Sequence, residues 1–293
     1  MLVIAAAVEP SLAGALGRGR PAGAMPGAAL REQGDARFHE LLPAPGVRAP
    51  DTPRVSTPLR RSLGQMPLPW LTFLAWAALG LAFASAVLIL YDIYGRGHRQ
   101  AMGVMEAVWP VTALYFGPLA WLGYRRWGRL NSPSYQHQTR AEPHYGEPVS
   151  VGIGVSHCGA GCTLGDVIGA WLVFAFGWEL LGLALPAEYI ADFTLAFALG
   201  IAFQYFSIAP MRDLGVRDGI VAALKADTLS LIAFEIGLFG WMAFMQLVLF
   251  TSPHLAPDHA AYWFLMQVGM VLGFATAYPV NVWLIRRGIK EAM

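Results

Sequence analysis

Residues 156–166 read Ser-His-Cys-Gly-Ala-Gly-Cys-Thr-Leu-Gly-Asp, and they open one of several long apolar runs in this chain of 293 residues. The stretch holds both cysteines of the chain, Cys158 and Cys162, beside His157 and ahead of Asp166. Residues four apart in a helix share a face, so Cys158, Cys162 and Asp166 are predicted to form one polar stripe.

Glycines define a second face of the same segment. Gly161, Gly165 and Gly169 also recur every four residues, and they lie about 100° around the helix from the cysteine stripe. A bare stripe of this kind lets the backbone of another helix approach closely. We therefore expect a tightly packed helix pair here, with the cysteine cluster at the point where a membrane helix meets water.

The composition is that of an integral membrane protein. Hydrophobic residues make up 56% of the chain and charged residues only 13%, and the mean hydropathy is +0.48. Soluble domains are much less apolar than this, so the expected surroundings are a lipid bilayer. The net charge of +1 gives no indication of nucleic-acid binding, and two cysteines are too few for a disulfide framework.

Six apolar segments have the length of about 20 residues that a bilayer crossing requires. They predict an all-α, six-transmembrane-helix bundle in which residues 185–187 join the third and fourth spans as a tight hairpin. The amphipathic residues 212–226 are predicted to form a short interfacial helix. The predicted spans are residues 68–91, 104–124, 163–184, 187–208, 229–250 and 261–285.

Residues 1–66 differ in composition from the rest of the chain. They are rich in Ala, Gly, Pro and Arg and show no helical or strand period. Such a segment lacks the apolar residues needed to bury a core, so it is predicted to be a disordered extension. Alternatively, translation starts at Met66, directly before the first span, and the extension is not part of the native product.

Basic residues predict how the six spans are oriented. With both termini on the cytoplasmic side, thirteen arginines and lysines from Arg54 onward lie in internal segments, and only Arg96 and Arg99 lie outside. This distribution follows the positive-inside rule and predicts cytoplasmic N and C termini. It also places the cysteine cluster on the cytoplasmic side, where reducing conditions argue against a permanent disulfide. His254 and His259 fall on the opposite side.

Several motifs from Pro69 onward are specific as a set. They are residues 92–94 (DIY), 108–119 (VWPVTALYFGPL), 157–166, 204–211 (QYFSIAPM), 237–242 (GLFGWM), 276–281 (TAYPVN) and 285–290 (IRRGIK). Together they resemble the bacterial membrane family described as domain of unknown function 4396, over about three quarters of the chain. The resemblance implies a bacterial multi-pass membrane protein, and we expect it to lie in the inner membrane. It brings no established activity and no catalytic or binding residue.

Soft ligands predict the leading function, which is the transport or handling of a metal ion, copper(I) first and zinc second. Thiolates, thioethers and imidazoles suit these ions. Glu235 lies inside the fifth predicted span, where a carboxylate is energetically costly and therefore indicates a function. Methionines line one face of the fifth and of the sixth span. Two histidines in the outer loop would collect the ion. The predicted ligands are His157, Cys158, Cys162, Asp166, Glu235, Met242, Met245, Met266, Met270, His254 and His259.

The same residues support other interpretations. Methionines in membrane helices are more often packing residues than ligands, and cysteine can serve as a small hydrophobe, with Asp166 placed in the first helical turn by the helix dipole. A second function is a thiol oxidoreductase that uses the cysteine pair. A third function is that of a non-catalytic assembly partner of another membrane complex. Assembly into a homo-oligomer is also compatible with the sequence. The chain has no Gly-Lys-Ser/Thr phosphate loop, which argues against ATP-driven transport by this chain alone.

Further carboxylates lie within or beside the predicted spans. Glu179 and Asp192 are expected to face each other across the helical hairpin, as a protonated pair or a proton relay. Glu188 and Asp92 fall at the rims of the predicted spans, where solvation is sufficient to explain them.

Overall fold

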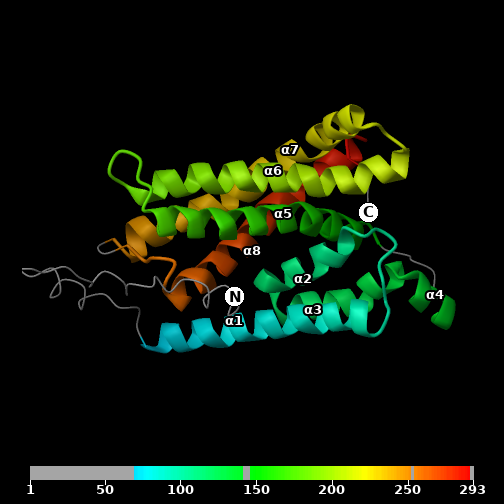
Figure 1. The fold of residues 1–293 in the computed structure, drawn as a ribbon, viewed down its shortest axis with the longest axis horizontal. Helices are drawn as coiled ribbons and strands as arrows, with labels where there is room; N and C mark the ends of the chain where they lie inside the picture. Colours follow the sequence, from blue (N-terminus) through cyan, green and yellow to red (C-terminus); the bar gives the residue numbers. More distant parts are fainter. Residues whose placement is uncertain (1–68, 141–145, 252–253, 291–293) are drawn as a thin grey trace, which may run out of the picture. The chain divides into compact units, whose positions relative to one another are not determined.

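The computed structural model describes residues 69–140, 146–251 and 254–290, all within the compact unit Ser56–Met293. This part of the chain is built from helices, eight of which are α-helices (Figure 1). The predicted extension of residues 1–66 lies outside the described residues. The helices are α1 Pro69–Leu90, α2 Met105–Phe116, α3 Pro118–Arg126, α4 Pro133–Thr139, α5 Glu147–Phe176, α6 Ala184–Arg212, α7 Val216–Phe244 and α8 Ala260–Arg286.

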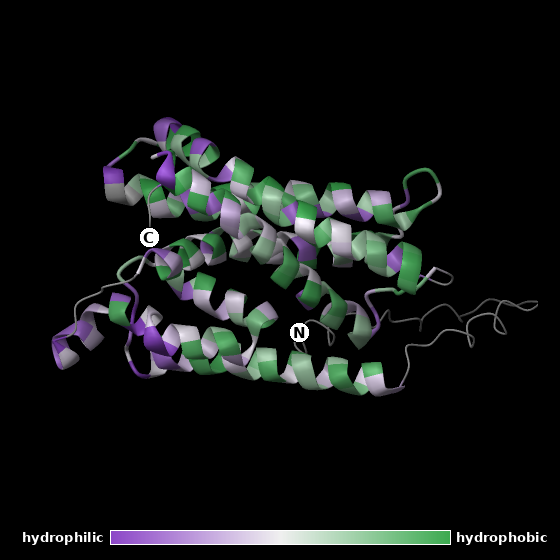
Figure 2. Cartoon of the chain, turned by 180° about the vertical axis from the view of Figure 1, so that it is seen from behind, coloured by the Kyte–Doolittle hydropathy of each residue, from purple (hydrophilic) through white to green (hydrophobic). Residues whose placement is uncertain are grey.

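Five of the described segments are long and apolar enough to cross a membrane. They are Pro69–Gly95, Glu147–Phe176, Ala184–Ala209, Val216–Leu249 and Ala260–Arg286. Large apolar side chains are exposed along them, as on helices that face lipid, and Figure 2 shows hydrophobic residues along the lengths of the long helices. The chain is therefore a multi-pass integral membrane protein.

The predicted second span, residues 104–124, is wrong. Gly117 breaks it into α2 and α3 by adopting φ 56° and ψ −129°, a conformation that side chains disfavour. Pro118 then begins α3, because a proline has no N–H to donate and suits the first helical position. A Cβ on Gly117 would lie 3.8 Å from the Cα of Ala82, in the middle of α1. α2 and α3 thus form a hairpin that enters the bundle and returns to the same end (Figure 1).

The predicted interfacial helix, residues 212–226, is also wrong. Arg212 is the last residue of α6, and residues 216–226 are the first turns of α7, which continues to Phe244 without a break. Only Asp213–Gly215 separate the two helices, and Asp213 ends α6 in the left-handed conformation with φ 50°. Gly177, with φ 61°, ends α5 in the same way and before the predicted boundary.

Two of the spans end in π turns, Tyr91–Gly95 and Met245–Leu249. Each closes with a hydrogen bond over five residues: the N–H of Arg96 donates to Tyr91 O at 3.1 Å, and that of Phe250 donates to Met245 O at 2.9 Å. A π turn holds one residue more than an α-helical turn and re-aims the side chains within it. Asp92, within the first π turn, is buried.

The helix ends, first turns and connections that carry the twelve arginines and lysines of the described residues lie at one end of the bundle, which we call the basic end (Figure 1). α1 and α8 end there, and α5 and α7 begin there. The loops at the opposite end, residues 177–183 and 250–259, contain neither arginine nor lysine. The twelve residues are Arg96, Arg99, Arg125, Arg126, Arg129, Arg140, Arg212, Arg217, Lys225, Arg286, Arg287 and Lys290.

The predicted external position of Arg96 and Arg99 is wrong. Arg96 and Arg129 both contact Asp92, so the loop after α1 lies at the same end as the segment after α3. Five spans also place Pro69 and Arg286 at opposite ends of the bundle (Figure 1). The prediction of two cytoplasmic termini rested on an even number of spans and loses that basis.

This topology predicts an all-or-none labelling pattern in cells, with the basic end in the cytoplasm. Gly103 is exposed beside Arg99, and no heavy atom lies within 4 Å of a Cβ built on it. A Gly103→Cys variant should therefore resist a membrane-impermeant maleimide in intact cells and react after lysis. Glu179→Cys, in the opposite loop, should react in intact cells. Labelling of Gly103→Cys before lysis would restore the six-span topology.

Candidate functional site

The close packing expected for the glycine stripe is confirmed. A Cβ on Gly161 would lie 2.5 Å from the Cα of Gly200 in α6, and Cβ atoms on Gly165 and Gly169 would overlap the backbone of Ala196 and the side chain of Asp192. No side chain fits between these positions, so the backbones of α5 and α6 are in direct contact over several turns. The adjoining cysteine stripe of α5 faces the interior of the bundle.

Cys158 and Cys162 lie deep inside the bundle. Both thiols are free and 0% exposed, because α5 begins at Glu147, about three turns before Cys158. The prediction that the cluster lies where a membrane helix meets water is therefore wrong, and Asp166 lies in the interior of α5, not in its first turn. Residues 147–162 include many small residues, whose low hydropathy hid their continuity with the span.

Side chains from two other helices face the cysteine pair. Glu235 of α7 is 3% exposed and interacts with the thiol of Cys162. Tyr115 of α2 interacts electrostatically with both thiols. Neither oxygen of Glu235 has a nitrogen or oxygen atom of another described residue as a hydrogen-bond partner. We call these four residues the thiol centre; they bring two soft ligands and two proton carriers together.

Three further carboxyl groups continue from the thiol centre toward the end opposite the basic end. Asp166 of α5 and Asp192 and Glu188 of α6 are all buried. Asp166 interacts electrostatically with Glu235, Asp192 and Glu188. None of the four carboxyl groups forms an ion pair within the described part of the chain. The predicted facing of Glu179 and Asp192 is not seen, since Glu179 lies in the exposed loop between α5 and α6.

His157 points away from the cysteines that it adjoins in sequence. Its buried ring packs edge-on against Phe203 of α6, with 6.2 Å between the ring centroids. It interacts electrostatically with Asp227 and Lys290, whose side chains form a buried ion pair of 2.7 Å at the basic end. Neither ring nitrogen of His157 has a hydrogen-bond partner among the described residues.

The structure distributes the remaining predicted ligands between the core and the opposite end. His254 contacts the carbonyl oxygens of Gln246 and Phe250, each at 3.1 Å from its Nδ1, and His259 lies 3.7 Å from the carboxylate of Asp258. In residues 69–140, 146–251 and 254–290, no three His, Cys, Asp or Glu side chains are arranged to hold a metal ion. The four predicted methionine ligands share one apolar core with the cysteines; they are Met242, Met245, Met266 and Met270.

The motifs of α5 to α8 belong to a known family. A family model described as "Domain of unknown function (DUF4396)" matches residues 149–290. The chain contains a DUF4396 domain. It includes the cysteine pair and all four buried carboxyl groups, whereas Tyr115 lies outside it. The resemblance is confirmed for this range, and for residues 68–148 it stays a prediction. No curated protein and no solved structure gives a significant match.

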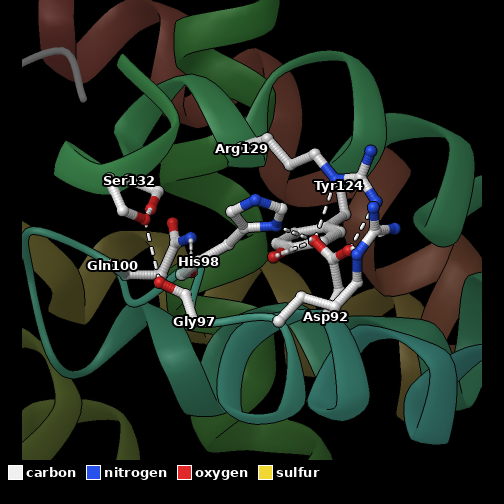
Figure 3. Close-up of polar contacts among 9 residues, drawn as sticks. Asp92, Gly97, His98, Gln100, Tyr124, Arg129 and Ser132 are labelled. Carbon is white, nitrogen blue, oxygen red and sulfur yellow. Dashed lines mark hydrogen bonds and ion pairs between the residues drawn. The ribbon is translucent and has the colours of Figure 1, made fainter. Parts of the chain in front are cut away.

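A second polar cluster, outside the DUF4396 domain, was missed by sequence reasoning. Asp92 is 1% exposed and accepts hydrogen bonds at Oδ2 from His98 Nδ1 at 2.9 Å, Tyr124 Oη at 3.0 Å and Arg129 Nε at 2.8 Å (Figure 3). At Oδ1 it accepts from Arg129 Nη2 at 2.5 Å and from Arg96 Nη1 at 3.4 Å. The explanation of Asp92 by solvation is therefore wrong, and the same holds for the buried Glu188.

Electrostatics fix the roles of the donors in this Asp92 cluster. Burial, together with the charge of Asp92, raises the pKa of Tyr124 well above its usual range, so its hydroxyl remains the donor. Burial alone would lower the pKa of Arg129, but the bidentate pairing with Asp92 raises it instead. The cluster joins the end of α1 to α3 and to the turn Gly128–Asn131. Each of these donors is paired with the carboxylate of Asp92, which indicates a structural clamp.

Proposed function

We propose that the protein transports or hands on a soft metal ion through the interior of the bundle in the bacterial inner membrane. Cys158 and Cys162 would be the central ligands. The supporting observation is that two free thiols, one turn apart on α5, are fully buried in a membrane-spanning helix. Thiolates are the ligands that copper(I) prefers.

The arrangement favours copper(I) over zinc. Two thiolates suffice for linear coordination of copper(I), so the separation of His157 from the cysteines does not count against this ion. Structural zinc sites take four protein ligands, and the described residues offer no such group at the thiols. Glu235 is the acidic side chain that interacts with Cys162.

Thioethers support a route to this pair from the end opposite the basic end. Met242 and Met245 come from α7 and its π turn, Met266 and Met270 come from the first half of α8, and all four are buried in the core that contains the cysteines. Uncharged thioethers bind copper(I) without adding charge to the interior. His254 and His259, in the loop at that end, would collect the ion.

Metal content tests the proposal directly. Protein purified in detergent under reducing conditions and loaded with copper(I) should retain about one ion per chain after dialysis, and Cys158→Ser/Cys162→Ser should retain none. His157→Gln is the matched control, since its ring faces α6 and should leave binding unchanged. Transport further requires copper uptake into proteoliposomes that the double variant lacks. Wild-type protein that takes up no metal would refute the proposal.

The alternative function, a membrane thiol oxidoreductase, has less support. Thiol–disulfide exchange needs a partner sulfur or quinone to reach the attacking thiol, and both thiols are 0% exposed. Its distinctive result would be a disulfide between Cys158 and Cys162 that forms and disappears as the cells are oxidised and reduced.

A further inference from the structure

We propose that Glu188, Asp192 and Asp166 form a proton path from the end opposite the basic end into the interior of the bundle. The inference stands on the arrangement of these three carboxyl groups and does not depend on which ion, if any, the cysteines bind.

The three groups follow one another along the bundle. Glu188 lies about one turn into α6, and Asp192 lies one turn further, a step of about 6 Å along the axis. Asp192 packs directly against Gly169 of α5, where a Cβ would overlap its Oδ1. Asp166 lies about one turn from Gly169 on the same helix. The missing side chain at Gly169 therefore lets the path cross from α6 to α5.

The path ends at Asp166, which is 0% exposed and lies one turn from Cys162 on α5.

None of the three carboxyl groups forms an ion pair within the described part of the chain. Both oxygens of Asp166, and one oxygen each of Asp192 and Glu188, are buried and have no hydrogen-bond partner among the described residues. An unpaired carboxylate in such surroundings costs several kcal/mol, so the stable form carries a proton. A protonated carboxyl both donates and accepts hydrogen bonds, which allows transfer along the row, directly or through water.

Among the described residues, the other titratable groups around the path supply no opposing charge. Glu235 of α7, which interacts electrostatically with Asp166, is itself an acid. Tyr189 of α6 lies beside Glu188 and Asp192, and its hydroxyl donates to Phe239 O at 2.7 Å. The hydroxyl of Tyr262 in α8 is buried and has no hydrogen-bond partner in the described part of the chain. The buried cation Lys290 is paired with Asp227 near His157, at the basic end.

Infrared spectroscopy of the metal-free full chain in lipid nanodiscs tests the path. At neutral pH, we expect a C=O band of protonated carboxyl groups that loses amplitude in Asp166→Asn. After transfer into D₂O, the band should shift promptly because the groups exchange protons with bulk water. Glu188→Gln should slow this shift at least about tenfold, since the amide cannot relay a proton across the apolar end of the path.

Two further variants keep the result interpretable. Asp192→Asn interrupts the path at its second step and should slow the shift as Glu188→Gln does, so the test rests on two separate variants. Glu179→Gln, in the exposed loop at the same end, is the matched control and should leave both amplitude and exchange unchanged. An absent protonated band, or exchange unaffected by both Glu188→Gln and Asp192→Asn, would overturn the proposal. Because no metal is present, neither result depends on copper binding.

Discussion

Gly165→Leu is expected to abolish the folded α5–α6 pair. Any Cβ at this position would overlap the backbone N and Cα of Ala196, so the two helices must move apart before even alanine fits. Overpacking in cores that can adjust by side-chain motion costs about 1–3 kcal/mol. Here the obstacle is backbone, and Gly165→Ala should already cost more than this. Gly165→Leu should yield no monodisperse protein in size-exclusion chromatography.

A control on the same helix separates packing from helix propensity. No heavy atom lies within 4 Å of a Cβ on Gly154, and alanine is favoured over glycine in a helix by about 1 kcal/mol. Gly154→Ala should therefore match or exceed the melting temperature of the wild type in detergent. Equal melting temperatures for Gly165→Ala and the wild type would show that the backbones are not in contact.

Asp92→Ala is expected to lower the free energy of unfolding by about 3–5 kcal/mol, the usual cost of removing one partner from a buried ion pair. The change leaves the side chain of Arg129, which is 12% exposed, without its bidentate acceptor. It also removes the acceptor of Tyr124 and His98. The end of α1 should then separate from α3, and the loss should appear in reversible denaturation in mixed micelles.

The exposed ion pair Arg286–Glu147, at the same end, provides the comparison. Its side chains are 69% and 60% exposed and 3.4 Å apart. Surface pairs of this kind contribute about 0–1 kcal/mol, because water and salt screen them. Glu147→Gln should thus have little effect. A loss of similar size in Asp92→Ala and Glu147→Gln would contradict the role of Asp92 as a buried clamp.

The features predicted correctly from sequence are those set by local periodicity. The span at residues 261–285 matches α8, and the glycine stripe of α5 packs as expected, because length and four-residue spacing are visible in the chain itself. The division of the span at residues 104–124 was missed because mean hydropathy does not register a break. The Gly117-Pro118 dipeptide was the available signal, since this pair punctuates helices.

The site was harder to predict because it depends on which helices are neighbours. Cys158 and Cys162 were identified by their rarity, but His157 was grouped with them from adjacency in sequence. One residue along a helix is a rotation of about 100°, and this rotation directs the imidazole toward α6. The partners of Asp92 include Tyr124 and Arg129, 32 and 37 residues away, and no pattern in the sequence pairs them.

The π turn Tyr91–Gly95 makes the Asp92 cluster sensitive to chain length at one point. A homologous chain with one residue fewer in this turn would continue as a regular α-helix, and its carboxylate would be rotated by about 100° away from the position of Arg129. In an alignment with such a chain, a single-residue gap opposite residues 91–95 would then accompany the loss of the arginine at the position that corresponds to Arg129. Such a gap would divide proteins that share the DUF4396 domain into those that anchor the α2–α3 hairpin to α1 through this carboxylate and those that must anchor it differently.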